Sequence, residues 1–281
     1  MTTGRGVLAW LRTAAVALLD EQGSTRPAAA LRVGLVLVLW SRFAAELELF
    51  MGLAPERLAL SLSFYASTTL FLLGAWSRLT GAWVALTALW LHFGLGVRGG
   101  VEPYQHHHVV ALALGAALIA LLPTGGSWSL DRLWALRRAE RAGQPPPPER
   151  GPTWARHLLA LHVVSIYGWG TFAKLSPAYL NGDRFTHYLM RLYFGSDLPS
   201  FPGFGALMVV LAWSAIFIEP MIGLGLLFRR TRWAALWLGL AFHGLIYWTM
   251  PVGTFTVTMW LFFIAFFPPD ELDQLGRRLS A

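Results

Sequence analysis

A series of apolar segments, most of them near 20 residues long, constrains this chain more than any other feature. The eight segments lie near residues 31–50, 60–77, 79–97, 105–122, 155–175, 205–228, 232–249 and 253–267. About 20 apolar residues are needed for a helix to cross the hydrocarbon core of a bilayer. Backbone polar groups in lipid must be satisfied within the segment, which a helix achieves. The sequence therefore predicts an all-α fold, a polytopic membrane bundle of about eight transmembrane helices.

The composition agrees with this prediction. Hydrophobic residues make up 56% of the chain and charged residues only 13%, whereas a soluble domain carries about 25% charged residues. The net charge is +7, but the basic residues flank the apolar segments, so we expect membrane lipid and no nucleic acid as a partner. The absence of cysteine excludes disulfides, thiolate metal sites and a cysteine nucleophile.

The sequence predicts one integral membrane domain over residues 1–281, with three parts that lie outside the apolar segments. We expect residues 1–28 to form an N-terminal interfacial helix anchored by Trp10, without a cleavable signal peptide. Residues 132–153 are predicted to form a cytoplasmic linker, because the run Pro145–Pro148 favours an extended segment. Residues 268–281 form a C-terminal tail.

The distribution of basic residues predicts the orientation. With the N-terminus inside, 16 of the 22 basic residues fall on the cytoplasmic side and 5 outside, and Arg42 lies within the first segment. Cytoplasmic loops of membrane proteins carry the excess of Lys and Arg. We therefore expect cytoplasmic N- and C-termini, in a bacterial inner or cell membrane.

Ionisable residues inside the apolar segments are the candidates for function, because burying them in a bilayer is costly. Arg42 and Glu46 are four residues apart and are expected to neutralise each other on one helix face. His92 and His162 are each expected to bond a neighbouring helix. The others are His106–His108, Lys174, Glu219 and His243.

Lys174 is the only lysine beside 21 arginines. An arginine stays protonated, whereas a desolvated lysine amine can lose its proton and act as a base. The predicted topology brings His106–His108, Lys174 and His243 to the outer leaflet, with Glu219 nearer the midplane to orient or neutralise one of them. Aromatic residues flank these positions and suit a flat apolar ligand: Tyr167, Trp169, Phe172, Phe242, Tyr247 and Trp248.

Several motifs in order carry a resemblance to a known family. They are Leu31-Arg32-Val33-Gly34, Gln105-His106-His107-His108, Ser127-Trp128-Ser129-Leu130-Asp131, the segment from Tyr167 through Lys174 to Gly182, and the helices around Glu219, His243 and Gly253-Thr254-Phe255. They resemble the horizontally transferred transmembrane (HTTM) family, which includes the membrane part of vitamin K-dependent gamma-glutamyl carboxylase. The resemblance covers most of residues 28–270.

The resemblance implies an activity. In that family a lysine deprotonates a reduced vitamin K hydroquinone, whose reaction with O2 yields an epoxide and a strong base. That base takes a proton from a glutamyl γ-carbon, and CO2 adds. The resemblance places Lys174 on the lysine, and His108 and His243 on histidines of the site, so these three are expected to be catalytic. We expect His107, Tyr167, Glu219 and Phe242 to bind the substrate.

The expected cofactor is therefore a vitamin K or menaquinol-type hydroquinone, with O2 and CO2 as co-substrates and no metal. A separate protein substrate or partner on the outer face is a further expectation. The resemblance covers the membrane part of the carboxylase, and we expect no counterpart of its large lumenal domain, which leaves the acceptor open. Two alternatives to the enzyme remain: a non-enzymatic quinone-binding membrane subunit, and a metal-dependent membrane enzyme using His and Glu ligands such as Glu102, His106 and His108.

Overall fold

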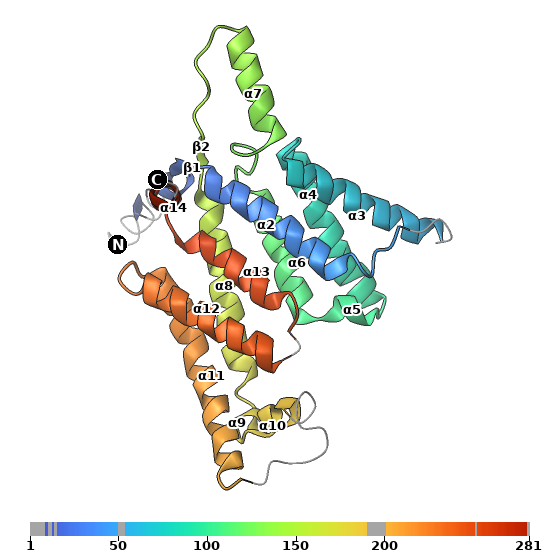
Figure 1. The fold of residues 1–281 in the computed structure, drawn as a ribbon, viewed down its shortest axis with the longest axis vertical. Helices are drawn as coiled ribbons and strands as arrows, with labels where there is room; N and C mark the ends of the chain where they lie inside the picture. The colour runs from blue at the N-terminus through green and yellow to red at the C-terminus, as the bar shows by residue number, and fades with distance from the viewer. Residues whose placement is uncertain are drawn as a thin grey trace. The chain divides into compact units, whose positions relative to one another are not determined.

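The computed structural model of the chain describes residues 9–10, 13, 16–49, 54–189, 201–250 and 252–279 and is mostly helical (Figure 1). Of residues 1–28, expected to form an N-terminal interfacial helix, residues 16–19 are helical, but residues 22–24 form a strand and residues 26–28 belong to the next helix. Residues 1–8, 11–12 and 14–15 lie outside the described residues. The chain divides into two compact units, here called unit 1 (residues 1–159 and 267–281) and unit 2 (residues 160–266). That the whole chain acts as one membrane domain stays a prediction.

Five helices and a π-helical stretch form the apolar part of unit 1: α2 (Arg26–Phe43), α3 (Pro55–Leu73), α4 (Ser77–Leu89), η1 (Trp90–Arg98), α5 (Glu102–Gln105) and α6 (His107–Ala120). Helix α4 packs against α3 and α6. A Cβ atom on Gly81 would lie 3.2 Å from that of Ala120, so the missing side chain permits the close approach of α4 to α6. Helix α3 starts at Pro55 and ends before Gly74, whose φ of 66° provides a left-handed cap.

Unit 1 also contains short polar elements that the sequence analysis did not predict. They are β1 (Gln22–Ser24), α7 (Leu130–Arg141), β2 (Arg150–Pro152) and α14 (Pro269–Leu279). The two strands pair antiparallel, with Gln22 opposite Pro152. The region expected to be a plain linker therefore holds most of α7 and all of β2, and residues 142–149 and 153 lie outside helices and strands.

Side chains explain these unexpected elements. The Oγ of Ser129 accepts a hydrogen bond from the backbone N–H of Arg132 and starts α7. Near the strands, Glu149 accepts a hydrogen bond of 2.8 Å from Nε of Arg26. Burial acts to raise the pKa of Glu149, but the hydrogen bond and charge of Arg26 hold this pKa below its usual value. Such local capping and pairing leave no periodic apolar signal, which is why hydropathy alone did not reveal them.

Unit 2 contains most of α8 (Trp154–Ala173), followed by α9 (Pro177–Leu180), α10 (Asp183–Leu189), α11 (Phe204–Leu227), α12 (Arg232–Thr249), α13 (Phe255–Phe262) and a 3-10 turn, η3 (Phe263–Phe266). Helix α11 packs along α12, and α12 packs on α13. Glycines permit both contacts: a Cβ on Gly225 would lie 2.8 Å from that of Ala235, and one on Gly239 would clash with the Phe263 ring.

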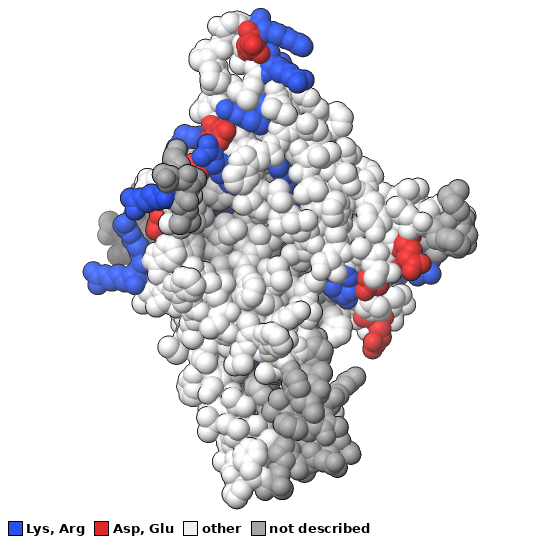
Figure 2. Space-filling model, in the orientation of Figure 1, with Lys and Arg blue, Asp and Glu red and all other residues white. Residues whose placement is uncertain are grey.

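Each of the eight predicted apolar segments contains a helix, which confirms the helical prediction. Two helical segments, Ser77–Arg98 and Phe204–Leu227, are long and apolar enough to cross a bilayer by length and composition. The charged residues on the visible face of unit 1 gather in two regions (Figure 2): over α7 and around the strands and α14, and near the start of α3 and α5. The number of spans and their orientation stay predictions.

Candidate functional site

The sole lysine of the chain forms an ion pair in unit 2. Lys174 follows the last residue of α8, and its Nζ lies 2.8 and 2.9 Å from the two carboxylate oxygens of Glu219 on α11. The same Nζ donates to the backbone carbonyl of Gly170, 3.1 Å away. Because Glu219 is only 7% exposed, its carboxylate depends on this amine for compensation.

Glycine at position 170 makes room for the pair. A Cβ atom there would lie 3.1 Å from Oε2 of Glu219 and 3.5 Å from Nζ of Lys174. Any side chain at this position would push the carboxylate away from the helix. Gly170 thus lets α8 and the carboxylate of Glu219 come together.

A second polar pair joins α8 to α12. The hydroxyl of Tyr167 lies 2.8 Å from Nε2 of His243, and these residues are 3% and 2% exposed. Tyr167 lies seven residues before Lys174, two helical turns along one face of α8. Glycine also allows α11 to lie close to Tyr167 on α8, because a Cβ on Gly223 of α11 would lie 3.2 Å from Cβ of Tyr167.

His243 keeps one ring nitrogen without a hydrogen-bond partner among the described residues. Its Nδ1 is buried, and the rings of Phe242, Phe255 and Phe263 lie 5.6, 5.6 and 6.1 Å from the imidazole. The hydroxyl of Thr256 donates to the backbone carbonyl of His243 and not to the ring. Because an unsatisfied buried polar atom is costly, Nδ1 is a candidate contact for a ligand hydroxyl.

Tyr179 is a site residue to which the sequence analysis assigned no role. Its ring centroid lies 5.9 Å from Nζ of Lys174, and its buried hydroxyl has no hydrogen-bond partner among the described residues. Burial, with the charge of Glu219 as a smaller cause, raises the pKa of Tyr179, so the hydroxyl keeps its proton and can donate. The signal in the sequence was its position five residues after Lys174.

The expected site residues fall into both units. Unit 2 brings together Lys174, Glu219, Tyr167, Phe242 and His243. In unit 1, His107 and His108 begin α6, with their ring centroids 4.1 Å apart. That these two histidines belong to the site of Lys174 stays a prediction.

Other ionisable residues have structural contacts. Arg42 and Glu46 form an ion pair of 2.7 Å within one helical turn, which confirms their mutual neutralisation. Nδ1 of His92 lies 2.8 Å from the backbone carbonyl of Tyr104 in α5, which confirms that His92 bonds a neighbouring helix. The ring centroid of His162 lies 6.1 Å from that of Phe262.

The metal-dependent alternative and part of the expected aromatic surround are not supported. Among the residues that the structure describes, no three His, Asp or Glu side chains gather closely enough to hold a metal ion. Of the six aromatic residues expected to flank the ligand, only Tyr167 and Phe242 are buried. The other four are more than half exposed and lie on the surface, where apolar rings of a membrane helix contact lipid: Trp169, Phe172, Tyr247 and Trp248.

Comparison with known proteins gives one family. The model of the HTTM domain matches residues 47–270, which is most of the chain and includes both polar pairs. No curated protein and no solved structure gives a significant match.

Proposed function

Because the chain belongs to the HTTM domain family, whose domain is associated with vitamin K-dependent carboxylase-like membrane proteins, we propose that it is a membrane enzyme acting on a reduced quinone. Lys174 takes a proton from a hydroquinone of the vitamin K or menaquinol type. When bound, the hydroquinone would react with O2 to give an epoxide, and this oxidation would drive the removal of a proton from an acceptor carbon, to which CO2 would then add. The observation that carries this proposal is the lysine amine held against a buried carboxylate.

The residues around Lys174 fit a phenolic ligand. A hydroquinone hydroxyl can both donate and accept a hydrogen bond, which suits the unpartnered Nδ1 of His243 and hydroxyl of Tyr179. When bound, the reduced quinone would supply the electrons for the reaction with O2. Tyr167 holds the His243 ring through Nε2, so that Nδ1 is the nitrogen left for the ligand. Phe242 provides apolar packing beside it.

Glu219 gives the lysine a way to become a base. The amine donates to both carboxylate oxygens and to Gly170, so its three hydrogens all have acceptors when it is protonated. Two separated charges are costly in an apolar site, so transfer of one proton to Glu219 leaves a neutral pair that needs less solvation. The transfer needs no movement of heavy atoms. The lone pair so formed on Lys174 faces Glu219, and rotation about the Cε–Nζ bond would turn it toward the substrate proton.

The proposal includes the placement of the protein. The chain forms a polytopic bundle of about eight spans with both termini in the cytoplasm, as the threefold excess of basic residues on that side supports. The site then faces the outer leaflet, where a lipid-soluble quinone enters from the membrane and a protein acceptor from outside. His107 and His108 lie in unit 1, at the outer end of their predicted span, and their part in the reaction stays a prediction.

Lys174→Arg is the decisive experiment. Arginine keeps the charge and the reach to Glu219 but cannot lose its proton, so we expect hydroquinone oxidation to fall by 10²-fold or more with normal expression. Lys174→Ala should be equally inactive and partly rescued by small amines. A lysine that only anchors or pairs predicts the reverse order, with Lys174→Arg near wild type.

A non-enzymatic quinone-binding subunit is the second candidate. The full set of acceptors around Nζ also suits a structural ion pair, and this observation favours it. Product analysis separates the two candidates, because only the enzyme converts hydroquinone to epoxide.

A further inference from the structure

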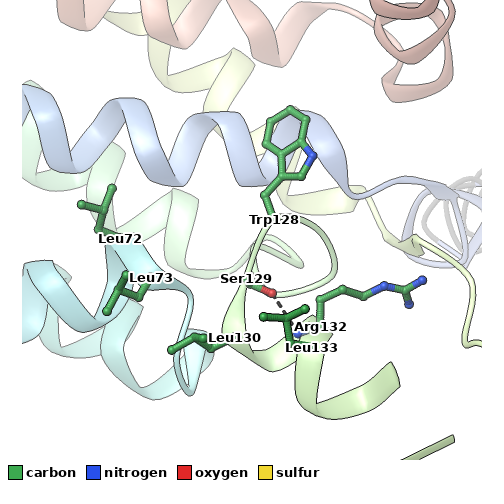
Figure 3. A pocket seen from close by; sticks show the side chains of 7 residues that line it. All are labelled: Leu72, Leu73, Trp128, Ser129, Leu130, Arg132 and Leu133. Carbon is green, nitrogen blue, oxygen red and sulfur yellow. Dashed lines mark hydrogen bonds between the residues drawn. The ribbon is translucent and has the colours of Figure 1, made fainter. Parts of the chain in front are cut away.

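A hollow on unit 1 lies outside the proposed catalytic site. It measures about 380 Å³ and is lined by Leu72 and Leu73 of α3, by Leu130, Arg132 and Leu133 of α7, and by Trp128 and Ser129 before α7. Figure 3 shows the leucines of α3 and α7 around the opening, with the Trp128 ring projecting from the preceding turn. Leu73 and Leu133 are each 49% exposed. The hollow therefore presents an open apolar surface.

Two tryptophans beside this hollow are held outward by an unusual backbone. Trp76 and Trp128 have φ values of 46° and 48°, a conformation that bulky residues rarely adopt. The carboxylate of Asp131 accepts from the N–H of Trp76, and Arg32 donates to the carbonyl of Trp128. Their side chains remain 58% and 62% exposed. Exposed tryptophans are typical of the boundary between lipid and water.

Basic residues continue the same surface along α7. Leu130, Leu133 and Arg137 follow a spacing of three and four residues, which places them on one face of the helix. Arg137, Arg138 and Arg141 are exposed, and Figure 2 shows the corresponding positive charge over α7. The surface therefore passes from apolar to cationic over two helical turns.

We propose that the hollow holds an acyl chain of an anionic phospholipid, with the phosphate on the exposed arginines of α7. An apolar ligand alone would leave these arginines unused, and free phosphate would leave the leucines exposed, whereas an anionic lipid satisfies both. The orientation proposed above puts α7 at the cytoplasmic leaflet, where polybasic segments bind anionic lipids. The proposal rests on the membrane placement and is independent of catalysis at Lys174.

Site-specific quenching tests the proposal, because the chain has no cysteine of its own. Leu133→Cys, labelled with a bimane fluorophore, is reconstituted in phosphatidylcholine vesicles that contain equal fractions of brominated phosphatidylglycerol or brominated phosphatidylcholine. We expect stronger quenching by the anionic lipid. Adding Arg137→Gln should lower the preference for that lipid about fivefold, since each arginine near a membrane surface contributes about this factor.

The matched control is Arg229→Gln, another exposed arginine on the predicted cytoplasmic side, which should leave the preference unchanged. Equal quenching by both lipids, or a preference that Arg137→Gln does not lower, would refute the binding of an anionic headgroup by the arginines of α7. Quenching by neither lipid would overturn lipid occupancy and point to another partner. Hydroquinone oxidation is measured separately, so an inactive enzyme with selective quenching would refute only the proposed function.

Discussion

At the scale of single residues, Lys174 differs from every other basic residue of the chain in what its side chain can do. The guanidinium of an arginine always carries its proton, whereas a lysine amine can give it up in a desolvated site. The structure adds Glu219 as the group that can receive this proton. It also adds Tyr167, which fixes the ring of His243. For Glu219 and for Tyr167, one substitution each distinguishes a role in the reaction from a role in packing alone.

Glu219→Gln keeps the shape of the carboxylate and one acceptor oxygen but removes the proton acceptor. If Glu219 takes the proton of Lys174, we expect hydroquinone oxidation at neutral pH and saturating hydroquinone to fall by about 10²-fold, with unchanged expression. Steady-state turnover and quinone affinity are the measurements. If Glu219 only holds the lysine in its charged form, the same change favours the neutral amine, so wild-type or higher turnover would refute the proton transfer.

Tyr167→Phe removes one hydroxyl and leaves Nε2 of His243 without its partner at 2.8 Å. We expect turnover to fall about tenfold because the imidazole loses its fixed orientation, while leaving a buried ring nitrogen unpartnered costs about 1–3 kcal/mol of stability. Tyr247→Phe, at a position 56% exposed, is the control. Thermal unfolding and hydroquinone oxidation are compared in both variants. Wild-type turnover in Tyr167→Phe would show that the Tyr167–His243 hydrogen bond serves packing and not the reaction.

At the scale of elements, the segment Ser127–Asp131 joins helices of unit 1. The carboxylate of Asp131 accepts from the N–H groups of Trp76 and Ser77 at 2.8 and 2.7 Å and so caps the start of α4. Arg32, fully buried in α2, donates to carbonyls of Thr124 and Trp128. Two of the motifs that suggested the family, those containing Arg32 and Asp131, therefore have a structural role, because their side chains hold the turns between helices.

Asp131→Asn should therefore lower the stability of the fold without changing the turnover per folded molecule. Replacing the charged acceptor of three hydrogen bonds is expected to cost about 1–3 kcal/mol, measured as a lower unfolding temperature in detergent. Asp270→Asn is the control: this carboxylate accepts from Arg150 and from the backbone N–H of Ser24, but it is about half exposed, and such an exposed ion pair contributes at most about 1 kcal/mol. A loss of turnover per folded molecule in Asp131→Asn, without a loss of stability, would contradict this structural role.

At the scale of the whole molecule, the distribution of arginines governs the predicted orientation. Gln144 is exposed in the segment before the prolines, and Glu56 is exposed in the first turn of α3. In the proposed orientation these two positions lie on opposite sides of the membrane. The test is simple because the chain has no native cysteine.

Gln144→Cys should react with a membrane-impermeant thiol reagent only after the cells are permeabilised. Glu56→Cys should react in intact cells and serves as the control for expression and reagent access. The reasoning is the positive-inside rule, under which loops rich in arginine stay in the cytoplasm. Labelling of Gln144→Cys in intact cells would show that the predicted orientation is wrong and that Lys174 lies toward the inner leaflet.

The sequence by itself determined the helical class, because each apolar segment is a local property that any arrangement of the chain must bury or place in lipid. It also determined the pair Arg42–Glu46, whose spacing on one helix fixes the contact, and it marked Lys174 as unusual through composition alone. These features need no knowledge of which helices are neighbours.

Only the tertiary structure decided the partners within the site. Lys174 and Glu219 are 45 residues apart in the chain, and Tyr167 and His243 are 76 apart. Which side chains meet over such separations depends on how each helix is rotated about its axis and how closely its neighbour approaches. Gly170 and Gly223 permit that approach on α8 and α11, but the periodicity of two apolar helices does not reveal which of their faces will pack together.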